Sequence, residues 1–87
     1  MKDLMCFVAV EFVDDPNVVG YYYWYLCNDD SVKEGDKVLA PLGRHNRLQE
    51  GVVRNVRFAD EENAPYPVHW IKCVKRVIKD SKNVSDS

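Results

Sequence analysis

The sequence lacks several features that would assign it to a familiar class of protein. No apolar run approaches the roughly 20 residues that a membrane-spanning helix needs, so we expect no membrane insertion. The N-terminal stretch MKDLMCFVAV carries Asp3 where a secretion signal is basic, and no small-residue cleavage site follows it. This stretch is therefore interpreted as a first β-strand.

Cysteine and histidine are both scarce and widely spaced. The three cysteines, Cys6, Cys27 and Cys73, are odd in number, which argues against a disulfide framework and favours a reducing, cytoplasmic location. Neither His45 nor His69 joins them at the close spacing of a zinc site. We expect buried free thiols, and neither a metal nor a cofactor.

Catalytic motifs are also missing. The chain has no glycine-rich phosphate loop and no nucleotide-binding fingerprint, and neither histidine accompanies a serine or cysteine nucleophile in a known motif. Its acidic clusters, at 14–15, 29–30 and 60–62, all fall in predicted loops, where such runs are usually solvated turns. We therefore expect that the protein is not an enzyme.

The 87 residues are enough for one domain, and their strand signals are strong. Runs of β-branched and aromatic residues, bounded by turn signals, occupy residues 4–13, 20–27, 37–43, 48–58 and 69–79, the last with a kink. The prediction is an all-β fold: a small single-domain β-barrel of five to six short, mostly antiparallel strands. We assign residues 1–80 to this domain and predict that 81–87 form a disordered tail.

Alternation within the strands predicts which side chains face inward. In the first run the even-numbered residues from Cys6 to Phe12 are all apolar, so this face is expected to line the core. The five consecutive aromatics Tyr21–Tyr25 place Tyr23 on one face and Trp24 on the other. Because so small a domain cannot bury both faces, one of them is expected to present rings to solvent or to a ligand.

Proline and glycine mark special positions in the third and fourth runs. Pro41 has no N–H to give to a sheet, so its strand must end there or lie at an edge. Gly43 is expected to adopt a backbone conformation closed to other residues. Gly51, inside the fourth run, suggests a bend or bulge.

Charge is distributed unevenly although the net charge is only −2. Residues 1–43 carry three Lys and eight Asp or Glu, whereas residues 44–87 carry nine Lys or Arg and six Asp or Glu. The basic residues lie along the third-to-fourth connection and the last run: Arg44, Arg47, Arg54, Arg57, Lys72, Lys75, Arg76 and Lys79. Basic groups beside aromatic faces are the two devices by which small barrels bind single-stranded nucleic acid. Solubilising arginines and core-filling aromatics remain the simpler interpretation of each feature alone.

The order of motifs resembles the N-terminal domain of the replication-restart helicase family PriA (primosomal protein N′). The matching stretches are Tyr23-Trp24-Tyr25, then VKEGDKVLAPLG, GVVRNV and finally IKCVKRV, and the resemblance covers most of residues 4–80. It implies a compact β-barrel that captures the 3′ end of a DNA strand. Each motif alone also occurs in Tudor-like and other SH3-like barrels, so the resemblance depends on the ordered series.

In that family an aromatic, an acidic residue, a glycine and a lysine form the pocket for the terminal nucleotide. The resemblance places the aromatic at Tyr23, the glycine at Gly43 and the lysine at Lys72, with Arg44 and Arg47 beside the groove. The acidic position falls on Trp24, whose indole stacks but accepts no hydrogen bond in its plane. The helicase motor has no counterpart within 87 residues, so the implied role is a stand-alone module, with replication, plasmid or phage proteins as possible partners.

Two other functions remain open from the sequence. One is a protein-interaction barrel of the SH3 or Tudor type, in which the aromatics bind a peptide or a methylated cation and no nucleic acid. The other is an assembly module whose aromatic strand pairs with a second copy.

Overall fold

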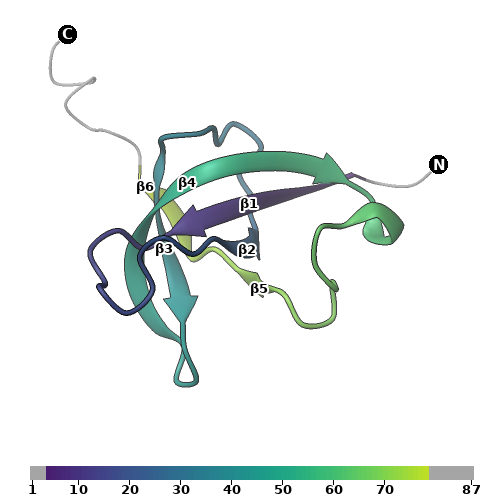
Figure 1. The fold of residues 1–87 in the computed structure, drawn as a ribbon. Coiled ribbons are helices and arrows are strands. Elements are labelled where there is room, and N and C mark those ends of the chain that lie inside the picture. The colour runs from purple at the N-terminus through teal and green to yellow at the C-terminus, as the bar shows by residue number, and fades with distance from the viewer. Residues whose placement is uncertain (1–3, 79–87) are drawn as a thin grey trace, which may run out of the picture.

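The computed structural model describes residues 4–78, which form a single six-stranded sheet curled into a half-barrel (Figure 1). Its elements are β1 (Met5–Glu11), β2 (Tyr23–Leu26), β3 (Lys37–Leu42), β4 (Arg47–Ala59), the 3₁₀ turn η1 (Glu61–Asn63), β5 (Lys72–Cys73) and β6 (Arg76–Ile78). The all-β prediction is confirmed. The predicted tail, 81–87, lies outside the described residues.

The sheet has the strand order β5-β2-β1-β4-β3-β6. Every pairing is antiparallel except β2 with β5, which is parallel. The 13 residues of β4 form a long, curved strand that pairs with β1 through its second half and with β3 through its first (Figure 1). Because one strand serves two neighbours, its curvature sets the curl of the sheet.

The segment between β5 and β6 connects β2 to β3, which lie on opposite sides of the curled sheet. The Val74 N–H donates to the carbonyl of Leu26 on β2 at 2.8 Å, and the next N–H, of Lys75, donates to the carbonyl of Leu39 on β3 at 2.7 Å. Successive backbone groups of an extended chain point in opposite directions, so two adjacent residues can bond to strands on either side. The change of partner strand at Val74 and Lys75 is the kink expected in the last run, and it separates β5 from β6.

The core fills the concave side of the sheet. The even-numbered residues of β1 face it as predicted, and Val8 and Val10 are fully buried there, together with Phe12, the residue after β1. Phe7 and Ala9, on the opposite face of β1, are also fully buried. The central strand is therefore covered on both sides, which the alternation pattern did not predict.

Gly51 is required by close packing rather than by a bulge. The break in register between β1 and β4 lies at Arg54, which the pairing skips: Ala9 pairs with Asn55, and Val10 pairs with Val53. At Gly51 itself an added Cβ would overlap Cγ1 of Val10. Only a residue without a side chain fits at this point of β4.

Gly51→Ala is expected to lower the free energy of unfolding by about 1 to 3 kcal/mol, the usual cost of overpacking a core. The measurement is urea denaturation, repeated in a Val10→Ala background. Because Val10→Ala removes the overlapping methyl group, Gly51→Ala should cost less there. Equal costs in the two backgrounds would contradict this assignment.

Candidate nucleic-acid interface

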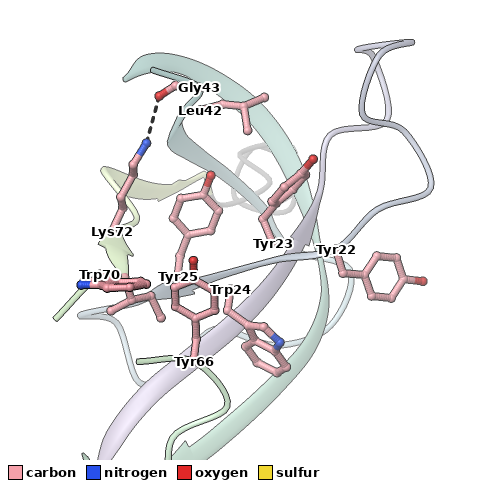
Figure 2. Close-up of a pocket in the computed structure, with 10 residues that line it drawn as sticks. Tyr22, Tyr23, Trp24, Tyr25, Leu42, Gly43, Tyr66, Trp70 and Lys72 are labelled. Carbon is pink, nitrogen blue, oxygen red and sulfur yellow. Dashed lines mark hydrogen bonds between the residues drawn. The ribbon is translucent and has the colours of Figure 1, made fainter. Parts of the chain in front are cut away.

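A pocket of about 360 Å³ lies where β2, the end of β3 and the segment leading into β5 meet (Figure 2). Six of its ten lining residues are aromatic, one is a cation and none is a carboxylate. The lining residues are Tyr22, Tyr23, Trp24, Tyr25, Leu42, Gly43, Tyr66, Trp70, Ile71 and Lys72. The surface therefore combines ring faces with one positive charge.

Two side chains of the pocket bond to the carbonyls at the end of β3. Strand β6 pairs with β3 only as far as Leu39, so the edge beyond it lacks a ladder partner. There the Tyr25 hydroxyl donates to the carbonyl of Pro41 at 2.6 Å, and the Lys72 ammonium donates to the carbonyl of Gly43 at 3.0 Å (Figure 2). β3 is not an edge strand, since it lies between β4 and β6, but it ends at Leu42, one residue after Pro41. Of the two predicted alternatives, the end of a strand is therefore the one that holds. The two bonds tie β2 and β5 across the pocket to β3.

Gly43 begins the four-residue turn between β3 and β4. Its φ is +80°, a left-handed value that other residues rarely adopt, as predicted. A Cβ built there would meet no atom within 4 Å, so the space beside its backbone is open. Lys72 is exposed, and its ammonium contacts Gly43 at the carbonyl oxygen.

Alternation divides the β2 aromatics between two surfaces, as predicted. Tyr25 is buried and packs edge-on against Phe12, with Tyr23 beside them. Trp24 points to the opposite side of β2 (Figure 2), where the Arg57 guanidinium lies 5.9 Å from the centre of its ring. The pocket thus extends around the edge of β2 from the core side to the outer side.

Four of the six residues predicted for the site line this pocket together: Tyr23, Trp24, Gly43 and Lys72. Arg44 and Arg47 do not line it. Arg44 is exposed in the turn that follows Gly43, and Arg47 is the exposed first residue of β4.

Tyr66 and Trp70 line the pocket but were not predicted from the sequence. They belong to the connection between η1 and β5, which has no strand periodicity. Composition was the only available signal. Tyr66 lies between two prolines and Trp70 follows four residues later, in a loop whose sequence shows no buried face for either ring.

Comparison with protein-family models, curated proteins and solved structures found no match. Between residues 4 and 78, no helix is long and apolar enough to cross a membrane. Within the same range, no three His, Cys, Asp or Glu side chains gather in a group that could hold a metal ion.

Burial makes the Tyr25 hydroxyl a weaker acid than an exposed tyrosine. It raises the pKa of Tyr25 from 10.0 to about 12, and the neighbouring Tyr23 adds to this increase. The folded protein therefore keeps this proton at pH values where the unfolded chain has lost it. The stability tied to the neutral hydroxyl is complete below pH 10 and is lost as the pH rises towards 12. The full loss amounts to about 2 to 3 kcal/mol of unfolding free energy.

Tyr25→Phe is expected to lower the free energy of unfolding at pH 7 by about 1 kcal/mol, because the bond to Pro41 is lost. It should also flatten the decline in stability between pH 10 and 12. Urea unfolding at a series of pH values measures both effects, and Tyr21→Phe, at an exposed position, is the matched control. An unchanged decline in Tyr25→Phe would contradict the assignment.

Proposed function

We propose that this chain is a DNA-binding module whose pocket binds single-stranded DNA or the 3′ terminus of a DNA strand. The observation that carries the proposal is the composition of the pocket: six aromatic rings and the Lys72 ammonium, with no carboxylate in the lining. Ring faces stack on bases of any sequence, and a cation binds the phosphate that accompanies each base. Both requirements are met by neighbouring side chains.

Each candidate residue has a distinct part in this proposal. Tyr23 and Trp24 offer ring faces on the two sides of the β2 edge. Lys72 contributes the charge, and Gly43 leaves room for a sugar or phosphate to approach the backbone. Arg44, immediately after Gly43, meets the strand as it leaves the pocket.

The sign of the charge separates this proposal from one form of the protein-interaction alternative. A cage for a methylated cation requires ring faces free of competing positive charge. Here Lys72 already occupies one wall, and Arg57 lies over Trp24. Both cations oppose a positively charged ligand and favour an anionic one.

A proline-rich or other extended peptide is the second candidate ligand. The observation in its favour is that nine of the ten lining residues carry no charge, as in aromatic-lined grooves for such peptides. A peptide that displaces DNA from the pocket, or a partner captured from extract regardless of nuclease treatment, would favour this alternative.

The proposal also includes a biological setting. The three cysteines form no disulfide with one another, Cys6 and Cys27 being buried and Cys73 exposed, which suits a reducing cytoplasm. A module of this kind acts with replication, plasmid or phage proteins that handle exposed DNA strands, and it performs no catalysis itself.

The first test is a titration of a short labelled single strand, followed by fluorescence anisotropy at several salt concentrations. We expect affinity to fall with salt, with a log–log slope of about −0.7 for each phosphate neutralised. Lys72→Ala should weaken binding roughly tenfold or more, because a charge-assisted contact is lost. Lys75→Ala is the matched control, since Lys75 is exposed but lies outside the pocket lining.

Absence of binding below about 100 μM at low salt would reject the proposal, since non-specific affinities normally reach that range. The same strand with its 3′ end closed into a hairpin distinguishes the two binding modes. Weaker binding to the closed end, with the difference lost in Lys72→Ala, identifies a pocket for the terminus. Equal binding identifies a groove for internal nucleotides.

A second test compares two arginines of β4. Arg57 lies over the pocket residue Trp24, whereas Arg54 is neutralised by an ion pair with Glu11 at 2.9 Å. Arg57→Ala is expected to reduce affinity and to lower the magnitude of the salt slope by about 0.7, one phosphate contact. Arg54→Ala should leave the slope unchanged. Equal effects of the two substitutions would place the DNA away from Trp24.

A further inference from the structure

Two large rings of the pocket are exposed in a way that core packing does not explain. The Trp70 side chain is 76% exposed and Tyr66 is 42% exposed, yet both line the pocket. Tryptophan normally buries most of its large surface, and an exposed one beside a concave site is typical of a binding surface. These rings contribute little to the fold and remain available to a ligand.

The connection that carries the two rings is held at both ends. Asp60 caps η1 by accepting from the backbone N–H of Asn63 at 3.0 Å, and Lys72 begins β5. Between them the backbone N–H of Trp70 donates to the carbonyl of Pro67 at 3.0 Å, which closes a turn. Tyr66 also lies between two prolines, whose rings restrict the backbone. The backbone that carries the rings is thus largely positioned before a ligand arrives, which reduces the ordering cost of binding.

We propose that Tyr66 and Trp70 form a second base-stacking subsite, which holds the base of a nucleotide adjacent to the one bound at Lys72. This inference rests on the proposed function and adds a residue-level assignment to it. Trp70 precedes Lys72 by two residues, at most about 7 Å of backbone. A phosphate on the Lys72 ammonium therefore leaves a neighbouring base within reach of the Trp70 ring, which lies on the same wall of the pocket (Figure 2).

Charge selects a nucleic acid strand over an apolar peptide as the occupant. The cation beside the rings is Lys72, and Arg57, outside the pocket lining, lies over the lining residue Trp24. A strand with regularly spaced phosphates meets both cations while its bases meet the rings. An uncharged peptide meets the rings alone and leaves both cations without a counter-charge.

The test is a double-mutant cycle between the protein and the strand, read by isothermal titration calorimetry. The ligands are a thymidine tetranucleotide and its variants with one abasic residue at each position. Trp70→Ala should weaken binding of the intact tetranucleotide about tenfold, the effect of one lost stacking contact. For one abasic variant the wild type and Trp70→Ala should bind alike within twofold, because the base that stacks is already missing.

Three further variants check the assignment. Trp70→Phe should retain most of the affinity, since it retains a ring. Tyr66→Ala should couple to the same abasic position as Trp70→Ala. Tyr21→Ala, which removes an exposed tyrosine outside the pocket lining, should bind every ligand as the wild type does. Because Trp70 and Tyr66 are exposed, their replacement should leave the fold intact, which thermal unfolding verifies.

The outcomes separate the two proposals. If the wild type binds the tetranucleotide and Trp70→Ala binds it equally well, the second subsite is wrong and the proposed function stands. The subsite is also wrong if Trp70→Ala weakens every abasic variant as much as the intact strand. If the wild type binds no tetranucleotide, or a peptide displaces it, the proposed function fails and the subsite fails with it.

Discussion

Two consecutive backbone N–H groups join the two sides of the curled sheet. Val74 donates to β2 and Lys75 donates to β3, so a single short segment joins the two edges of a curled sheet. An open six-stranded sheet would leave both edges unpaired and its concave face wet. Closing the edges covers the core residues of β1 and fixes where the flanking residues lie. The position of Lys72, two residues before the first of these bonds, follows directly from that closure.

The pocket is the space that this incomplete closure leaves. Because β6 ends opposite Leu39, the carbonyls at the end of β3 take their hydrogen bonds from the Tyr25 hydroxyl and the Lys72 ammonium. These two side chains satisfy the backbone and also form the pocket wall. Of the remaining rings, Tyr23 packs against the core and Trp24 is half-buried. The other three, Tyr22, Tyr66 and Trp70, are exposed, which makes the pocket suited to a flat ligand. The same bonds that complete the fold therefore place a cation beside aromatic faces, the basis of the proposed DNA binding.

Much of the fold was predictable because its signals are local. Strand alternation correctly assigned the inner face of β1 and the division of the β2 aromatics, and the backbone chemistry of Pro41 and Gly43 correctly marked the end of a strand and a tight turn. Burial of Phe7 on the other face of β1 was missed, because the pattern does not say what covers a second face. Tyr66 and Trp70 were missed for a different reason: an irregular connection has no periodicity from which a direction can be inferred.

The amino-acid sequence by itself determined the strand class of each segment, the direction of the alternating side chains and the left-handed turn at Gly43. These depend on steric contacts between a residue and its immediate neighbours, so they can be deduced from short stretches. Only the tertiary structure decided that segments around residues 24, 43 and 70 share one pocket, and that Arg44 and Arg47 lie outside it. That arrangement depends on the curl of β4 and on hydrogen bonds between residues dozens of positions apart, which no local pattern encodes.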